Sequence, residues 1–201
     1  MAVGDFFRLY NQGTSDWEIQ PPEHEVWMIT AVRGPGGGNA ALSAINPTLY
    51  PYSNRWIMSL DYGSKAFNPY CRIIIDHENY LRVYFHNEHC VVEGYVLKDE
   101  SGYMQGIKGV VIGWCDQYVS DQVRPPAGEE WLITSVSHDI WNNWHMHDGT
   151  DNQAINFQSF PSQNAGLITT TNLSIRVTND LYLYATQELA FYCGFVTKLA
   201  P

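Results

Sequence analysis

The sequence contains little positive charge. Lys and Arg together number 11, against 21 Asp and Glu, which gives a formal net charge of −10. Proteins that bind nucleic acid without sequence preference need basic side chains to neutralise phosphates, and anionic membrane surfaces attract basic segments in the same way. Because the few basic residues are also scattered along the chain, the composition argues against a nucleic-acid partner and against an anionic membrane.

Long apolar runs and targeting patterns are also lacking. No stretch of about 18 apolar residues occurs, so no membrane-spanning helix is predicted. The first five residues, MAVGD, have neither the basic nor the apolar region of a secretory signal. We therefore expect a soluble protein that is made in a cytoplasm.

Cysteine is sparse and unpatterned. The chain has 4 cysteines, at positions 71, 90, 115 and 193, and none of them forms a C-x-x-C pair. A disulfide framework or a zinc site would show regular spacing. The sequence therefore predicts reduced thiols, most of them buried.

Catalytic and nucleotide-binding motifs are missing as well. The sequence spells no G-x-S-x-G, no H-E-x-x-H and no EF-hand loop. The glycine-rich stretch 34–38 is not followed by the Lys-Ser/Thr of a phosphate-binding loop. The sequence thus predicts neither an enzyme nor a bound cofactor.

Helical periodicity is the last absence. Apolar residues make up 45% of the chain and aromatic residues 14%, yet nowhere do they recur at a spacing of 3.6 over a dozen positions. Short apolar segments that alternate with polar residues and end at turn residues are typical of antiparallel strands. The sequence therefore predicts an all-β protein. Its strands are expected at 6–10, 25–33, 55–62, 91–97 and 191–197.

One motif occurs twice and organises the rest of the chain. The first copy, at 20–30, reads QPPEHEVWMIT, and the second, at 124–134, reads RPPAGEEWLIT. Both have Pro-Pro, a short turn, a Glu, a Trp and an apolar run that ends in Ile-Thr. Such repetition indicates a duplicated unit. The residues that define it are Pro21, Pro22, Trp27, Pro125, Pro126 and Trp131.

A second block of similarity follows each motif, displaced by 100 residues where the motif is displaced by 104. In each copy a pair of short strands surrounds a turn, at 76–79 or at 179–180, and a strand with an internal glycine follows. Such a glycine suggests a β-bulge or a close backbone approach at Gly94 and Gly194. The alignment pairs Ile75 with Ile175, Asn79 with Asn179, Leu81 with Leu181, Tyr84 with Tyr184, Glu88 with Glu188, Gly94 with Gly194, Val96 with Val196, and Lys98 with Lys198.

The order of the two blocks is the same in both copies, and the four-residue difference falls between them, where a surface loop tolerates insertion. We interpret the chain as two tandem homologous units, at 20–99 and 123–201. An N-terminal segment, 1–19, precedes them, and the connector 100–122 is expected to contribute a strand. The expected fold class is two antiparallel β-sandwiches of the jelly-roll type.

The segment 138–148 holds the candidate contact residues. Exposed Trp141 and Trp144 could stack on a sugar or fill a partner's pocket. His145 and His147 lie two residues apart and would share one side of a strand. In the alternative interpretation, one or both tryptophans belong to the core.

The same segment carries possible metal ligands. His145 and His147 could hold Zn²⁺ together with His138 or Asp148. The spacing fixes no third ligand, and the first copy has no equivalent cluster. No metal site is therefore predicted.

Acidic and histidine side chains also gather at two expected strand ends. Asp76, His77 and Glu78 form one group, and the other lies at 86–89. Either group could form an acid/base pair, but solvated loop tips explain them better. We interpret them as loop tips.

The second copy carries the fullest pattern. PPAGEEWLIT at 125–134 is followed by LSIRVTNDLYL at 173–183 and by an aromatic-x-Gly-Phe-Val at 192–196. Together these resemble small β-sandwich structural proteins of bacteriophage virions, which include capsid decoration or cement proteins and head-fibre or tail-associated modules. The resemblance covers 122–198 well and 20–98 more loosely, because Glu23-His24 stands where the second copy has Ala127-Gly128.

This resemblance implies a virion structural protein, most directly a capsid decoration or cement protein that binds the outer surface of the shell and stabilises it. It implies a homo-oligomer, in the first place a trimer, on the particle exterior, in contact with the major capsid protein or another virion protein. It supplies no catalytic residues. The alternatives are a receptor- or glycan-binding module of a fibre, spike or tail and, more remotely, a metal-dependent enzyme.

Overall fold

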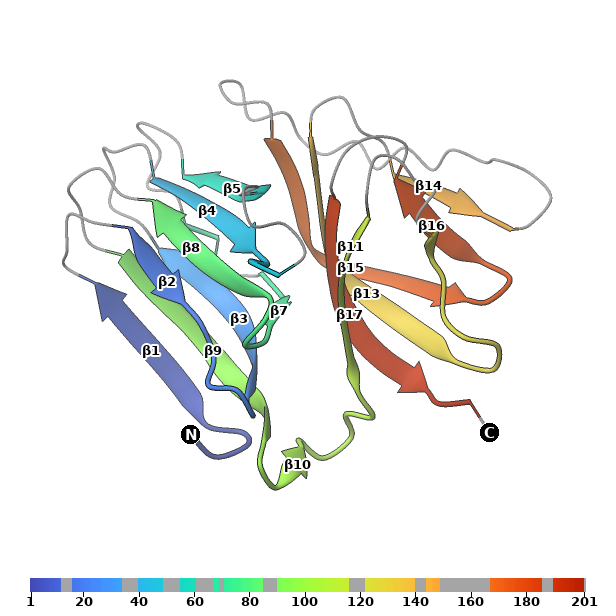
Figure 1. Cartoon of the computed structure of the whole chain (residues 1–201), viewed down its shortest axis with the longest axis horizontal. Helices are drawn as coiled ribbons and strands as arrows, with labels where there is room; N and C mark the ends of the chain where they lie inside the picture. Colours follow the sequence, from blue (N-terminus) through green and yellow to red (C-terminus); the bar gives the residue numbers. More distant parts are fainter. Residues whose placement is uncertain are drawn as a thin grey trace.

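The computed structural model describes residues 1–11, 16–33, 40–48, 55–60, 67–68, 71–84, 90–115, 122–139, 144–148, 167–185 and 190–200. In these residues the chain forms seventeen β-strands and no helix. The strands pair antiparallel in four sheets (Figure 1). The predicted all-β class is thus confirmed.

Sheet A contains β3, the strand that begins within the first motif. Its main path runs β1-β9-β3-β6, while β7 also pairs with β3 and β10 with β9. Three of the expected strands belong to it, those at 6–10, 25–33 and 91–97. The bounds are β1 (Phe6–Asn11), β3 (Val26–Arg33), β6 (Phe67–Asn68), β7 (Ile73–Ile75), β9 (Cys90–Asp99) and β10 (Gly102–Tyr103).

Sheet B runs in the order β2-β8-β4-β5. Side chains from sheets A and B share one hydrophobic cluster, in which Phe7 and Trp27 from sheet A lie with Ile19, Leu81 and Val83 from sheet B. Alternation along the strands directs these residues to one side. The bounds are β2 (Trp17–Ile19), β4 (Ala40–Ile45), β5 (Arg55–Leu60) and β8 (Tyr80–Tyr84).

Sheets C and D are formed by the second half of the chain. Sheet C runs β11-β17-β13-β15 and sheet D runs β12-β16-β14. The strand expected within the connector is present as β11. The bounds are β11 (Val110–Cys115), β12 (Gln122–Val123), β13 (Glu130–Asp139), β14 (Trp144–His147), β15 (Leu167–Thr178), β16 (Tyr182–Ala185) and β17 (Ala190–Lys198).

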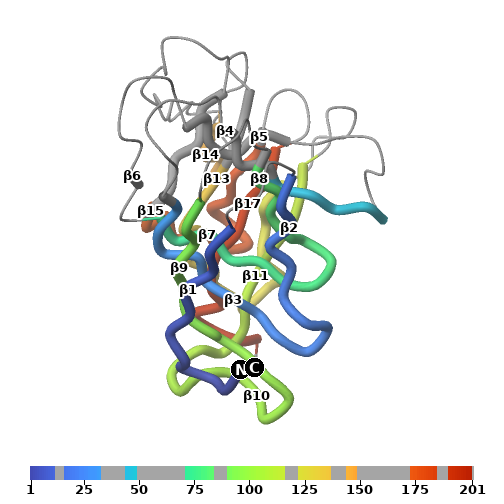
Figure 2. The backbone as a smooth tube through the Cα atoms, turned by 90° about the vertical axis from the view of Figure 1, so that its left-hand side faces the viewer, coloured from blue at the N-terminus to red at the C-terminus, as the bar shows by residue number. Residues whose placement is uncertain are grey.

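The two halves lie next to each other, with β7 of the first half beside β11 and β17 of the second (Figure 1). The segment that carries β10 links them. Figures 1 and 2 both place the two ends of the chain at the same end of the molecule as β10.

Strand pairing recurs in the second half with the same irregularities. β3 pairs with β9 in a register that shifts on either side of 27–29. β13 pairs with β17 in a register that shifts on either side of 131–133, which is 104 residues later. β1 and β11 complete the correspondence, since each pairs with the far edge of β9 or β17. The two halves therefore share a backbone pattern down to their β-bulges.

The alignment of the two hairpins needs a correction of two residues. β3 places Trp27 opposite Ile75, and β13 places Trp131 opposite Val177, so the hairpin is displaced by 102 residues and not by 100. The equivalent of Leu81 is accordingly Leu183 and not Leu181. The alignment by residue identity was two residues out of register. A shift of two residues keeps the same side chains facing inward, so the apolar pattern did not reveal the error.

The glycine inside each closing strand allows a close approach, as predicted. A Cβ added to Gly94 would lie 2.3 Å from the carbonyl oxygen of Met28 and 2.6 Å from the ring of Phe7. A Cβ added to Gly194 would lie 2.3 Å from the carbonyl oxygen of Leu132. Both contacts are far inside normal packing distances, so only glycine fits beside the neighbouring strand.

The Glu and Trp of the repeated motif bind each other. In the first copy, the Glu25 N–H donates to the carbonyl of Pro22 (2.9 Å), and the indole N–H of Trp27 donates to the Glu25 carboxylate (2.5 Å). Both bonds recur at 3.0 Å in the second copy, where Glu129 supplies the carboxylate. A largely buried indole N–H needs an acceptor, and the turn after Pro-Pro supplies it. The motif therefore has a structural role, in which the Glu links the Pro-Pro turn to the Trp.

Candidate functional site

The outer face of sheet C, which points away from sheet D, is covered by the first half of the chain. Its side chains belong to the hydrophobic cluster of the first half, whereas the inner face of sheet C packs in a separate cluster with sheet D. We call this surface the covered face. Its members on β11 and β17 are Val110, Ile112, Trp114, Phe191, Cys193 and Phe195.

β7 and the residue before it cross the covered face. The carbonyl oxygen of Arg72 accepts hydrogen bonds from the hydroxyls of Thr134 and Ser135, each 2.9 Å away. Two residues later, the N–H of Ile74 donates to the sulfur of Cys193 at 3.2 Å. The first contacts lie on β13 and the second on β17, so β7 runs across successive strands of sheet C.

The turn after β7 reaches β11 through Asn79. The side-chain oxygen of Asn79 accepts hydrogen bonds from the amide of Asn46 (2.8 Å) and from the indole N–H of Trp114 (3.0 Å). Its amide nitrogen donates to the carboxylate of Asp76 (3.0 Å), which also accepts from the Asn79 N–H (2.7 Å). A buried amide with several partners is rigid. Asn79 therefore fixes the turn against both halves.

Along β1 and β9 the outer face of sheet A is open to solvent and carries aromatic side chains, and we call this part of the sheet the open face. The exposed fractions are 51% for Phe6, 52% for Tyr10 and 39% for Tyr95. The rings of Phe6 and Tyr95 meet edge to face, 5.4 Å apart. Between the aromatic side chains, the Arg8 guanidinium binds the Glu93 carboxylate at 2.7 Å. Exposed aromatic and Arg side chains are characteristic of protein–protein contacts.

This open face corresponds to the covered face of sheet C, position by position. β1 and β9 place Arg8 opposite Glu93, where β11 and β17 place Ile112 opposite Cys193. The same structural surface is thus charged at its centre in one half and apolar in the other. The flanking pairs are Phe6–Tyr95 for Val110–Phe195 and Tyr10–Val91 for Trp114–Phe191.

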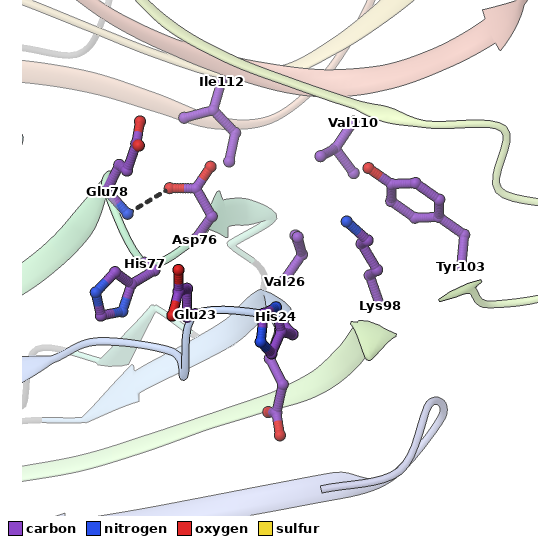
Figure 3. A pocket seen from close by; sticks show the side chains of 11 residues that line it. Glu23, His24, Val26, Asp76, His77, Glu78, Lys98, Tyr103, Val110 and Ile112 are labelled. Carbon is purple, nitrogen blue, oxygen red and sulfur yellow. Dashed lines mark hydrogen bonds between the residues drawn. The ribbon is translucent and has the colours of Figure 1, made fainter. Parts of the chain in front are cut away.

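A cavity of about 540 Å³ lies between the two halves (Figure 3). Carboxylates gather near one end of it, while the Lys98 ammonium lies 5.4 Å from the centre of the Tyr103 ring at the other. β11 contributes two apolar side chains across the cavity. Its lining comprises Glu23, His24, Glu25, Val26, Asp76, His77, Glu78, Lys98, Tyr103, Val110 and Ile112.

The acidic and histidine group at this cavity supports the turn. The Asp76 carboxylate accepts from the Glu78 N–H at 3.0 Å as well as from Asn79. The His77 imidazole lies 3.0 Å from the carbonyl oxygen of Pro21. Both side chains therefore contact backbone atoms, as expected of residues at a loop tip. The second group, at 86–89, lies outside the described residues.

The predicted histidine pair lies on one side of β14, facing two tyrosines of β16. His145 stacks on Tyr184, and His147 stacks on Tyr182, each with ring centres 5.1 Å apart. Arg124 continues the row, with its guanidinium 4.7 Å from the Tyr182 ring. Burial lowers the pKa of the His145 imidazole. We call these five side chains the ring row of sheet D.

The prediction that Trp144 is a contact residue is wrong. Its side chain is 0% exposed and lies in the hydrophobic cluster of the second half, so the core interpretation holds for it. Alternation on β14 explains the burial, because Trp144 and His145 point to opposite sides. Trp141 lies outside the described residues.

Among the described side chains, no group of three or more His, Cys, Asp or Glu could hold a metal ion. The side chain of His138 lies outside that set. In the part of the chain that the structure describes, no helix is long and apolar enough to cross a membrane. All four cysteines are free and buried, as predicted.

Sequence reasoning did not single out Phe6, Tyr10 or Tyr95. A signal was present, however, because β1 reads FFRLYN, in which Phe6, Arg8 and Tyr10 alternate with Phe7 and Leu9. A half-buried edge strand normally carries polar residues on its outer side. Aromatic residues at those outer positions therefore distinguish this face from an ordinary solvated edge strand.

No protein-family model matches the chain, and no curated protein or solved structure is significantly similar to it.

Proposed function

We propose that the protein is a non-catalytic structural protein of a virus particle, a decoration or cement protein that binds the outer surface of the shell and stabilises it. The open face of sheet A carries the assembly role in this proposal, because Phe6, Tyr10 and Tyr95 expose large apolar area around the Arg8–Glu93 pair. Such a surface suits an assembly contact. The setting in a virion rests on the sequence resemblance.

The finer architecture is part of the proposal. We infer two tandem homologous β-sandwiches of the jelly-roll type, at 20–99 and 123–201. The recurring register shifts in β3 and β13 support a common origin for the two halves. The hydrogen bond between Glu and Trp, which both copies form, supports this common origin independently.

We further propose that the protein works as a homo-oligomer, with a trimer as the first expectation, on the particle exterior and in contact with the major capsid protein or another virion protein. The net charge of −10 supports an exterior position. An acidic protein is repelled by packaged nucleic acid and needs no phosphate contacts outside the shell.

Binding to shells tests the proposed function. Purified protein is incubated with shells from particles that lack it, and the mixture is sedimented and then melted by calorimetry. Co-sedimentation and a higher melting temperature of the shell are expected, because a ligand that binds only the assembled shell stabilises it. A protein that stays in the supernatant at every concentration would contradict the proposal.

A second candidate, glycan or receptor binding, is favoured by the ring row of sheet D. His145, His147 and Tyr184 are partly exposed, and stacked rings are a common platform for sugars. A glycan array should then give a hit that Tyr184→Ala abolishes. The substitution Leu199→Glu, at an exposed site in the C-terminal segment, serves as the control. A hit that survives Tyr184→Ala would exclude the ring row.

A further inference from the structure

We propose that the occupant of the open face of sheet A is a second copy of this chain, bound head to tail through its segment 174–181. The inference rests on the proposed assembly role of that face, but not on the particle that the protein decorates. The internal contact between the two halves supplies the template for the contact between copies.

The covered face shows what this surface binds. In the first half, Arg72, β7 and the turn that ends at Asn79 lie across β13, β17 and β11 of the second half. The open face has the same strand order and the same bulges. The element that fits it is therefore the second half's own version of β7 and its turn.

That element exists and is accessible. Arg176 lies opposite Leu132 as Ile74 lies opposite Met28. The turn is also repeated, because Thr178 N–H donates to the carbonyl of Leu181 as Asp76 N–H donates to that of Asn79. The Arg176 side chain is 67% exposed and Leu181 is 37% exposed. Segment 174–181 thus repeats the covering element and keeps much of its surface in solvent.

At the centre of the contact, both partners are apolar within the chain, whereas both are charged in the proposed contact between copies. In the internal contact, Ile74 meets Cys193. The equivalent positions between copies are Arg176, on the segment 174–181, and Glu93, on the open face. These side chains carry opposite charges, so the exchange keeps the contact complementary.

A second pair changes in the same way. Val26 and Ile112 line opposite sides of the cavity between the halves. Their equivalents are Glu130, which already pairs with Arg176 by an ion pair, and Arg8, which pairs with Glu93. Docking would therefore interleave two ion pairs into one row of alternating charge, which stabilises both copies more than an isolated surface pair does.

At the end of the contact the difference is the opposite: a hydrogen-bonded pair within the chain corresponds to an apolar pair between copies. Asn79 binds Trp114 by a hydrogen bond in the internal contact. The equivalent residues are Leu181 and Tyr10, which are among the exposed large apolar side chains. Docking buries each of them against the other, and it removes apolar area that a free monomer leaves in water.

A head-to-tail contact of this kind uses different surfaces on the two copies, so it closes into a ring or continues as a filament. If three copies close, as the proposed trimer requires, the ring holds six halves joined by alternating contacts within and between chains. Every contact in such a ring would use the same structural surface, as the covered face within each chain and as the open face between chains.

The experiment measures self-association of the full chain by size-exclusion chromatography with light scattering. The wild type should be oligomeric. The variants Tyr10→Glu and Leu181→Glu, at exposed sites on opposite partners of the contact, should each weaken association about tenfold or more. Leu199→Glu, at a leucine that is 53% exposed, is the matched control and should associate as the wild type does.

Mixing the two variants decides the geometry. Tyr10→Glu keeps an intact segment 174–181, and Leu181→Glu keeps an intact open face, so equal amounts should form a dimer and nothing larger. A monomeric wild type at its highest soluble concentration would overturn the proposal. So would variants that associate normally, or a mixture that stays monomeric. Shell binding is measured separately, so failure of the proposed function is distinguished from failure of this contact.

Discussion

The side-chain oxygen of Asn79 accepts a hydrogen bond from the indole N–H of Trp114, 3.0 Å away, and this bond joins the two halves of the chain. Asn79 is 9% exposed and also accepts from Asn46. A single amide thus connects the turn after β7, the end of β4 and the first strand of sheet C.

Replacement of Asn79 by Ala should lower the free energy of unfolding by about 1–3 kcal/mol, because it removes the acceptor of two buried hydrogen bonds. Urea unfolding measures the change. The control Asn46→Ala keeps the bond to Trp114 and should leave contact between the halves intact. In a double-mutant cycle with Trp114→Phe, we expect a coupling energy of at least about 0.5 kcal/mol. A coupling energy of zero would show that the bond contributes nothing to stability.

Replacement of Gly94 or Gly194 by Ala should destabilise the protein by about 1–3 kcal/mol or more, since the new Cβ would meet backbone 2.3 Å away in either strand. Thermal unfolding followed by circular dichroism measures the effect. Gly106→Ala is a useful comparison, because Gly106 has a φ of 89° but nothing within 4 Å of an added Cβ. Because neither Gly94 nor Gly194 has a positive φ, losses there no larger than the loss at Gly106 would contradict close approach as the cause.

The four cysteines should resist thiol reagents in the native state. Burial raises the pKa of Cys71 and Cys90 to about 12 and that of Cys193 to about 11, and the thiolate is the reactive form. Mass spectrometry after brief alkylation at pH 8 should find no label on the folded protein and four labels after denaturation. Labelling of Cys193 without denaturant would show that the halves separate in solution.

Acid should weaken the protein partly through His145. Burial lowers the pKa of this imidazole below its ordinary value of 6.5, so the unfolded chain binds the proton more tightly than the folded chain does. The contribution to stability is complete above about pH 6.5 and is lost as the pH falls through the lowered pKa. Melting temperatures between pH 8 and pH 5 should therefore fall less steeply for His145→Phe, which keeps a ring on Tyr184. Identical slopes would contradict this assignment.

The sequence was sufficient for the strands at 6–10, 25–33, 91–97 and 191–197 and for the positions of the two glycines, because alternation and strand-breaking residues are local signals. It did not predict β4 at Ala40–Ile45. It was not sufficient for the partner of each motif glutamate, since only the folded turn shows that the Glu25 carboxylate reaches the Trp27 indole. It also misplaced one hairpin by two residues. Alternation constrains the parity of a register but not its absolute value.

The covered face was missed although the sequence contained a signal for it. β11 reads VVIGWC and β17 reads AFYCGFVTK, so both carry apolar residues at successive positions. Strands that are buried on both sides have continuous apolar runs, whereas β9 has Glu93 where β17 has Cys193. A comparison of the two closing strands would have predicted that sheet C is covered on both faces.

The shared hydrophobic cluster has a consequence for how the protein is made. Phe191 and Cys193 complete the packing around β7, yet they are translated more than a hundred residues after it. During translation, Ile74 of the first half would stay exposed to solvent until β17 had emerged from the ribosomal exit tunnel. The newly made chain is therefore most open to chaperones and to aggregation during this interval, and synthesis rate becomes a determinant of yield.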